Sequence, residues 1–154
     1  TASYTIDIQE KAFNMILKEE YEQLKELLKI EKNKILTGQY KKELMFPAKY
    51  REIETKPSHF RAAIKAKELG YLINEEDSYL WCYIIKDENI DSDVMAVPLD
   101  EDLPSNITID YERMCDRVLI KPLEPVLESI NMSWEIIFPA PIPKDRQSKL
   151  FEEW

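Results

Sequence analysis

The sequence is poor in the residues on which many common sites depend. Its 154 residues include two glycines, one histidine and two cysteines. Two separated glycines, Gly38 and Gly70, exclude the glycine-rich phosphate loops of P-loop and dinucleotide-binding folds. The single histidine, His59, excludes a metal site built on two histidines, and Cys82 and Cys115 lack the close spacing of a zinc finger. We therefore expect neither a metal site nor a cofactor in this chain.

Long apolar runs are also absent from the sequence. It contains no stretch of about 18 apolar residues, so we expect no transmembrane helix and no membrane partner. The first residues lack the basic and apolar segments of a secretory signal, and we expect a cytoplasmic protein. Because the chain does not begin with Met, we interpret it as a fragment or a trimmed protein. Its length suits one domain, or one domain with a tail.

Charges of opposite sign are distributed unevenly along the chain. The formal net charge is −9, which by itself argues against nucleic acid as a partner. Residues 32–67, however, contain ten basic and three acidic residues, a net charge of +7, and the remainder carries −16. Such asymmetry indicates a polyanion-binding patch on an acidic body. The alternative is a solvated helix face followed by a lysine-rich loop.

Apolar residues at helical spacing predict the first two helices. One amphipathic stripe runs through residues 6–36, and we expect a single long helix that Gly38 ends. The next helix should follow Pro57, which disfavours helical angles in the residue before it. Ser58 supplies a capping side chain, and Gly70 fits the position just past the helix end.

The remaining elements predict an α+β fold, in which long amphipathic helices pack with a small antiparallel sheet. Residues 44–47 suit an edge strand, because Pro47 has no amide hydrogen to donate. Residues 79–85 and 94–97 are rich in aromatic and β-branched side chains and predict two paired strands. A third helix should begin near Asp110 and be kinked or broken by Pro122 and Pro125.

The segment between the two paired strands contains the pattern Asp91-Ser92-Asp93, which resembles a metal-binding pair of carboxylates. A two-metal site needs a third carboxylate and a nucleotide pocket, and the neighbouring sequence supplies neither. We interpret the segment as a polar turn, because Asp, Asn and Ser side chains favour turns.

The start of the helix after Pro57 is a candidate phosphate site. Backbone amides at a helix N-terminus are unpaired and carry partial positive charge, so they attract phosphate. Basic and polar side chains gather around this end: Lys56, Ser58, His59, Arg61 and Lys65. We predict a phosphate clamp there, and capping with ordinary packing is the alternative.

The C-terminal segment carries spaced anchors after a proline-rich spacer. Residues 138–143 contain three prolines, are expected to be extended and cannot pack as a helix. The terminal peptide has the form Q-x-x-L-x-x-x-W, with candidate contacts at Gln147, Leu150, Phe151 and Trp154. Such a peptide suits insertion into a hydrophobic pocket of a partner, and packing on its own domain is the alternative. We therefore divide the chain into residues 1–134 and 135–154.

Three motifs, taken in order, resemble parts of one protein family. Ile109-Asp110-Tyr111-Glu112, followed by Leu119-Ile120-Lys121-Pro122-Leu123-Glu124, resembles the last conserved helix of family B DNA polymerases, most closely the replicative polymerases of T-even-like bacteriophages. Lys56-Pro57-Ser58-His59-Phe60 with Ala62-Ala63 resembles the start of a thumb helix in that family. Lys149-Leu150-Phe151-Glu152-Glu153-Trp154 resembles their C-terminal clamp-binding peptide. The order of long helix, basic loop, helix after Pro57, strand pair, terminal helix and clamp peptide covers essentially the whole chain.

The resemblance implies a thumb domain over residues 1–134 and a linker with a clamp-binding peptide over 135–154. The thumb would grip the primer–template duplex through backbone contacts, and the peptide would hold the sliding clamp through Gln147, Leu150, Phe151 and Trp154. We expect the DNA contacts at Lys49, Arg51, Lys56, Ser58, His59, Arg61, Lys65 and Lys121.

The resemblance also implies what this chain lacks. The family's catalytic carboxylates and their Mg²⁺ lie in the palm, which would be a further partner, and neither palm nor exonuclease motifs occur here. We therefore expect this chain to be inactive alone. The resemblance also implies that it is part of a viral protein in a bacterial host. One alternative is a protein–protein adaptor without DNA contact. A small hydrolase is a weaker alternative, because no convergent acid–base set accompanies the single histidine.

Overall fold

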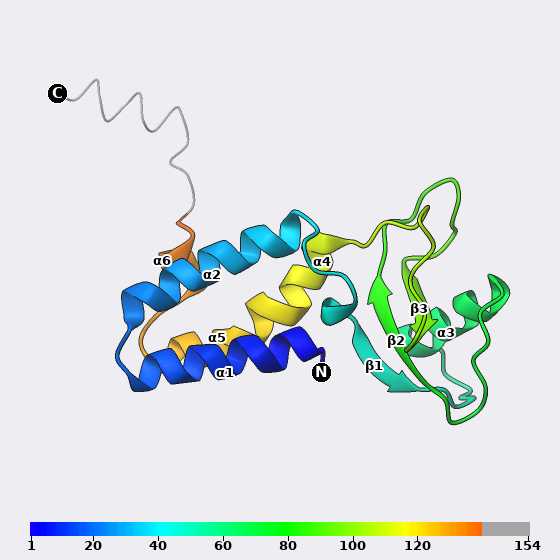
Figure 1. Cartoon of the computed structure of the whole chain (residues 1–154), viewed down its shortest axis with the longest axis horizontal. Helices are drawn as coiled ribbons and strands as arrows, with labels where there is room; N and C mark the ends of the chain where they lie inside the picture. Colours follow the sequence, from blue (N-terminus) through cyan, green and yellow to red (C-terminus); the bar gives the residue numbers. More distant parts are fainter. Residues whose placement is uncertain (140–154) are drawn as a thin grey trace, which may run out of the picture.

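The computed structural model describes residues 1–139, which form a helical half and a sheet half side by side (Figure 1). The helical half contains α1 (Ser3–Leu17), α2 (Tyr21–Leu36), α4 (Tyr111–Cys115), α5 (Lys121–Glu128) and α6 (Trp134–Ile137). The sheet half contains β1 (Phe46–Lys49), α3 (Ser58–Glu68), β2 (Ser78–Tyr83) and β3 (Val94–Pro98). The predicted α+β class with a small antiparallel sheet is confirmed.

The single helix predicted over residues 6–36 is wrong, because the chain forms two antiparallel helices, α1 and α2, joined by a tight turn (Figure 1). Glu19 adopts a left-handed conformation with φ 56° directly after the helix. The amides of Glu19 and Glu20 donate to the carbonyls of Ile16 and Met15 at 3.0 and 2.9 Å. This Schellman arrangement satisfies the last turn of α1, and its left-handed position is usually glycine.

The buried face of the helix pair also differs from the predicted stripe. Tyr4, Ile8 and Ala12 point into the core from α1, whereas Phe13 and Leu17 are 51% and 81% exposed. The apolar residues at helical spacing thus belong to two helices with different orientations. Periodicity across residues 6–36 therefore did not describe one continuous face.

A buried carboxylate joins the first two helices. Glu31 of α2 is 5% exposed and accepts hydrogen bonds from the hydroxyls of Tyr4 and Tyr40 at 3.0 and 2.9 Å. Burial and the neighbouring Glu31 carboxylate raise the pKa of Tyr4, so its hydroxyl stays protonated and keeps donating.

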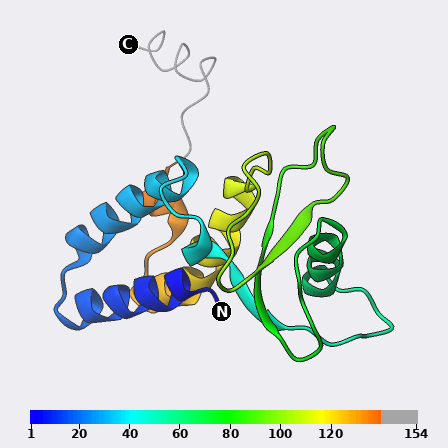
Figure 2. The same cartoon turned by 45° about the vertical axis from the view of Figure 1, so that its right-hand side comes forward.

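The strands form an antiparallel sheet in the order β1-β2-β3. The predicted pairing of the second and third strands is confirmed, with Trp81 opposite Ala96. The first strand is an edge strand that includes Pro47, as predicted, but it starts at Phe46, because Leu44 belongs to a 3-10 turn, η1 (Lys42–Leu44). The helix α3 packs against β2 and β3, as Figure 2 shows.

The third predicted helix begins as expected and changes helix type before its prolines. The Asp110 carboxylate accepts a hydrogen bond from the Arg113 amide at 3.0 Å and caps α4. A π-helical turn, η2 (Asp116–Ile120), then leads into α5. Pro122 has no amide hydrogen for the Val118 carbonyl one turn earlier, and the buried Thr5 hydroxyl donates to that carbonyl at 2.7 Å. The helical conformation thus continues from α4 through η2 into α5 with a change of helix type before Pro122, and Pro125 lies inside α5 and does not break it.

The packed part of the chain extends past the boundary expected at residue 134. Trp134 and Ile137 of α6 are 8% and 2% exposed, and the Trp134 indole donates to the Ile120 carbonyl at 2.7 Å. The predicted clamp contacts lie outside the described residues: Gln147, Leu150, Phe151 and Trp154.

Candidate nucleic-acid interface

The helix α3 places most of the predicted phosphate-binding residues. Three buried alanines, Ala62, Ala63 and Ala66, allow this helix to approach the sheet closely, which directs Arg61 and Lys65 away from it. Arg61 and Lys65 are four residues apart and therefore lie on one face of the helix.

The predicted role of Ser58 as the cap of α3 is wrong. Pro57 occupies the N-cap position in an extended conformation, and no side chain caps the helix. Ser58 is the first helical residue, and its hydroxyl accepts a hydrogen bond from Arg61 Nη2 at 3.2 Å. Pro57 starts the helix because its fixed φ is compatible with the turn into it.

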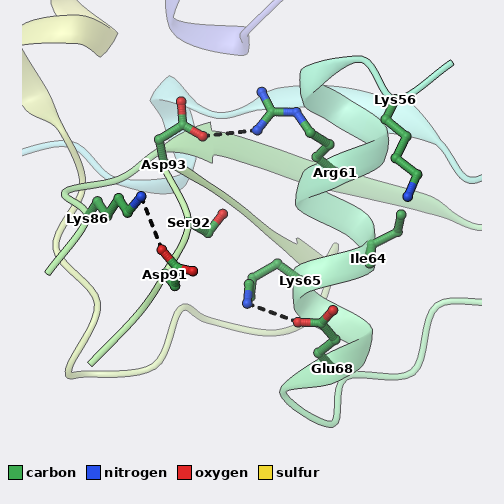
Figure 3. Close-up of a pocket in the computed structure, with 9 residues that line it drawn as sticks. All are labelled: Lys56, Arg61, Ile64, Lys65, Glu68, Lys86, Asp91, Ser92 and Asp93. Carbon is green, nitrogen blue, oxygen red and sulfur yellow. Dashed lines mark hydrogen bonds and ion pairs between the residues drawn. The ribbon is translucent and has the colours of Figure 1, made fainter. Parts of the chain in front are cut away.

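An open groove of about 640 Å³ lies between α3 and the chain that leads into β3 (Figure 3). Its α3 side consists of Arg61, Ile64, Lys65 and Glu68, together with Lys56 from the preceding loop. Its opposite side consists of Lys86, Asp91, Ser92 and Asp93. The groove thus combines three residues of the predicted clamp with a segment that is distant in sequence.

Ion pairs balance much of the positive charge in this groove. Figure 3 shows three of them: Arg61 with Asp93 at 3.1 Å, Lys65 with Glu68 at 2.9 Å, and Lys86 with Asp91 at 3.1 Å. Lys56 forms no ion pair with any other described residue. The four basic and three acidic side chains leave a small positive excess, far less than the sequence indicated.

Asp93 connects the groove to the helical half. Its Oδ2 accepts from Nη1 of Arg113 in α4 at 3.2 Å, while its Oδ1 accepts from Nη1 of Arg61 at 3.1 Å. Partial burial opposes ionisation of Asp93, but the hydrogen bonds from both arginines outweigh it and hold its pKa below the ordinary aspartate value. The guanidinium of Arg113 also lies 3.7 Å above the ring of Tyr83.

The structure places the other predicted DNA contacts outside the groove lining. Lys49 is exposed at the end of β1, and Arg51 pairs with Glu76 at 3.1 Å. His59 is partly buried, and its backbone carbonyl accepts from the Tyr79 hydroxyl at 2.9 Å.

Lys121 is further away, on α5 in the helical half, where it pairs with Asp116 at 3.5 Å. Figures 1 and 2 both show α5 and α3 well separated. Lys121 and the groove therefore cannot contact the same few phosphates of one strand.

The positive segment over residues 32–67 is divided between the two halves. Lys32 lies 4.2 Å above the ring of Phe138, and Lys34 lies 3.8 Å from Glu31. Lys42 donates to the Leu99 carbonyl at 2.7 Å. Part of the basic charge that appears as one patch in the sequence thus holds the helices and loops together.

Two further basic residues had no local signal in the sequence: Lys86 lines the groove, and Arg113 contacts Asp93 at its edge. Lys86 follows β2 in an acidic segment, and β2 and β3 separate Arg113 from Arg61 in the sequence. Tertiary contacts alone bring them to α3. Both Lys86 and Arg113 stand next to acidic residues in the sequence, so neither stood out as part of a basic patch.

The range of residues 1–139 contains no group of three or more His, Cys, Asp or Glu side chains that could hold a metal ion. None of its helices is both long and apolar enough to cross a membrane. No protein-family model and no curated protein matches this chain.

Proposed function

We propose that this chain is a DNA-gripping domain, equivalent to the thumb of a family B replicative DNA polymerase. The observation that supports this proposal is the groove beside α3, where Lys56, Arg61 and Lys65 meet Lys86. Ammonium and guanidinium groups along an open groove suit contacts with phosphates, which hold a duplex without reading its sequence. The duplex would then be contacted by Arg61 and Lys65 of α3, by Lys56 before this helix and by Lys86 on the opposite side of the groove.

The acidic partners in the groove set the expected strength of this grip. Arg61, Lys65 and Lys86 must each first leave, or share, a carboxylate before they bind a phosphate. Binding of the isolated domain should therefore be weak, independent of sequence and steeply dependent on salt. Such contacts suit a domain that follows a moving duplex.

The proposal assigns polymerisation to the rest of a longer enzyme. The palm would carry the catalytic carboxylates and Mg²⁺, and residues 147–154 would hold a sliding clamp. A peptide contact and a DNA contact on one chain reinforce each other, because each raises the effective concentration of the other. Two weak contacts can thus give stable attachment.

The test is the salt dependence of duplex binding. We expect fluorescence anisotropy with a labelled duplex to show affinity that falls steeply with salt. Replacing Arg61 and Lys65 by Ala removes two phosphate contacts, so the slope of log K against log salt should flatten by about 1.8, at about 0.9 per contact.

Lys25 and Lys29 provide the matched control for this double variant. Each pairs with a glutamate three residues away, as Lys65 does, but they lie on α2 in the helical half. Replacing both by Ala should leave the slope unchanged. Equal losses in the two double variants, or affinity that salt does not alter, would contradict the proposal.

An adaptor function is the second candidate, and one observation favours it. Ile6, Phe13 and Leu17 expose 55%, 51% and 81% of their surfaces along α1. Exposed apolar side chains on one helix suit contact with another protein. An absence of duplex binding at low salt, together with retained partner binding through α1, would favour the adaptor over the DNA-gripping domain.

A further inference from the structure

One carboxylate holds two arginines that come from different halves of the molecule. The two oxygens of Asp93 accept separately from Arg61 of α3 at 3.1 Å and from Arg113 of α4 at 3.2 Å. Two guanidinium groups on opposite oxygens of one oxyanion form the arrangement by which arginines recognise carboxylate and phosphate alike. In the free protein Asp93 occupies this place.

We propose that Arg61 and Arg113 form a binding site for a phosphate group, and that the Asp93 carboxylate competes with that phosphate. Given the DNA-gripping function proposed above, on which this identification rests, the phosphate belongs to the duplex backbone. Arg113 is then a DNA contact that the helical half contributes to a groove built by the sheet half.

Both arginines are accessible and have donors left for a ligand. The side chains of Arg61, Arg113 and Asp93 are 42%, 41% and 41% exposed, so a phosphate reaches them from solvent. A guanidinium has five N–H donors, and Asp93 accepts from one nitrogen of each arginine. Phosphate oxygens can therefore bind to the remaining donors and compete with the Asp93 carboxylate for the other two.

Contacts other than Asp93 keep the two guanidinium groups in position. Arg61 Nη2 donates to the Ser58 hydroxyl at 3.2 Å, within α3. Arg113 lies over the Tyr83 ring at 3.7 Å, and its amide is fixed by the Asp110 cap. Loss of the Asp93 charge therefore leaves a preformed pair of arginines, which is the condition for tighter phosphate binding.

The decisive comparison is between two acids of the same groove. Asp93→Asn and Asp91→Asn each remove one negative charge from it, but Asp91 pairs with Lys86 and not with the arginines. By duplex anisotropy at low salt, we expect Asp93→Asn to bind about tenfold more tightly than wild type, the effect of one charge-assisted hydrogen bond. Asp91→Asn should gain about twofold or less.

Arg113 decides whether this gain comes from the proposed site. Arg113→Gln should weaken the wild type and should remove the gain in the Asp93→Asn background, while Arg113→Lys should retain part of it. Thermal unfolding of every variant establishes that it is folded. Equal gains for Asp93→Asn and Asp91→Asn, or a gain that survives Arg113→Gln, would overturn the site. Weaker binding by Asp93→Asn would make Asp93 a positioning residue and would also overturn it.

A second probe separates this site from the DNA-gripping function. Inorganic phosphate is titrated into Asp93→Asn while the side-chain N–H signals of Arg61 and Arg113 are followed by NMR. We expect both signals to shift in Asp93→Asn, and the shift of the Arg61 signal to disappear in the double variant with Arg113→Gln, which has no Arg113 signal. Shifts without duplex binding would support the site and refute the proposed function. Duplex binding without such shifts would refute the site and support the proposed function.

Discussion

Asp93 shows how one side chain can serve both packing and function. It lies directly before β3 and joins α3 to α4 through Arg61 and Arg113. Its neighbours in the sequence, Asp91 and Ser92, gave it the appearance of a polar turn residue. The turn lies earlier, at Glu88 and Asn89 between the paired Asp87 and Ile90, and the side chain of Asp93 contacts residues that lie far from it in the chain.

The hydrogen bonds from Arg61 and Arg113 to Asp93 should make the stability of the protein depend on pH. Because the pKa of Asp93 is lower in the folded protein, its ionised form stabilises the fold at pH values above the unfolded value of about 3.9. That contribution is lost as the pH falls through the folded pKa. We expect the difference in free energy of unfolding between wild type and Asp93→Asn to be constant from about pH 5 to 7 and to shrink below about pH 4.

Denaturant unfolding of both proteins at a series of pH values measures this difference. The Arg61→Gln variant is the control, because it removes one of the two hydrogen bonds and should reduce the same pH-dependent difference. A difference that grows as the pH falls below about 4 would show that Asp93 is not held in its ionised form.

The candidate site could be predicted only where residues that are close in the sequence are also close in the structure. Arg61 and Lys65 are one helical turn apart, and Lys56 precedes the same helix, so local spacing located them correctly beside one groove. Lys86 and Arg113 reach that groove through strand pairing and helix packing. No local pattern encodes such contacts, because they depend on the positions of elements distant in the chain.

At the scale of elements, four helices end in the same way with different sequences. Gly38 and Gly70 have φ of 78° and 99°, and Glu19 and Asn131 have φ of 56° and 57°. In each case the next amide donates back to a carbonyl in the last turn. The two glycines predicted their helix ends, whereas Glu19 did not, because glutamate favours helical angles and rarely adopts a positive φ. This single residue accounts for the wrong prediction of one long helix.

Substitution of this residue should stabilise the turn between α1 and α2. Glycine has no Cβ to strain the left-handed conformation, so we expect Glu19→Gly to raise the free energy of unfolding by about 1 kcal/mol. The neighbouring Lys18, with φ −91°, is the matched control. Lys18→Gly gains nothing from glycine at that angle and should lower stability by about 0.5–1 kcal/mol. Urea unfolding measures both, and destabilisation by Glu19→Gly would contradict the role of strain.

At the scale of the whole molecule, the two halves share more than one connection. Beyond the Asp93 bridge, the Lys42 amine donates to the Leu99 carbonyl after β3, and Ile84 pairs with Ile109 ahead of α4. A buried core runs through both halves, from Leu28 of α2 to Val97 of β3. The buried core of the described residues is therefore continuous across both halves.

The C-terminal limit of this core leads to the last prediction. Two truncations compare α6 with the segment after it: one ends at Ser133 and the other at Pro139. The first removes Trp134, whose indole donates to the Ile120 carbonyl, and Phe138, which lies beneath the Lys32 amine. It leaves a cavity and an unpaired carbonyl, so we expect it to lower the free energy of unfolding by about 3–5 kcal/mol.

The truncation at Pro139 should leave the melting temperature and duplex affinity unchanged and abolish clamp binding, because it removes residues 140–154 and none of the contacts described above. Thermal unfolding followed by circular dichroism, duplex anisotropy and clamp pull-down measure the three properties. Retained stability with lost clamp binding assigns the peptide to a partner. If this truncation instead unfolds the domain, the terminal anchors pack on their own chain, and the tether to a clamp is refuted, because one set of apolar side chains cannot fill both the core and the pocket of a partner.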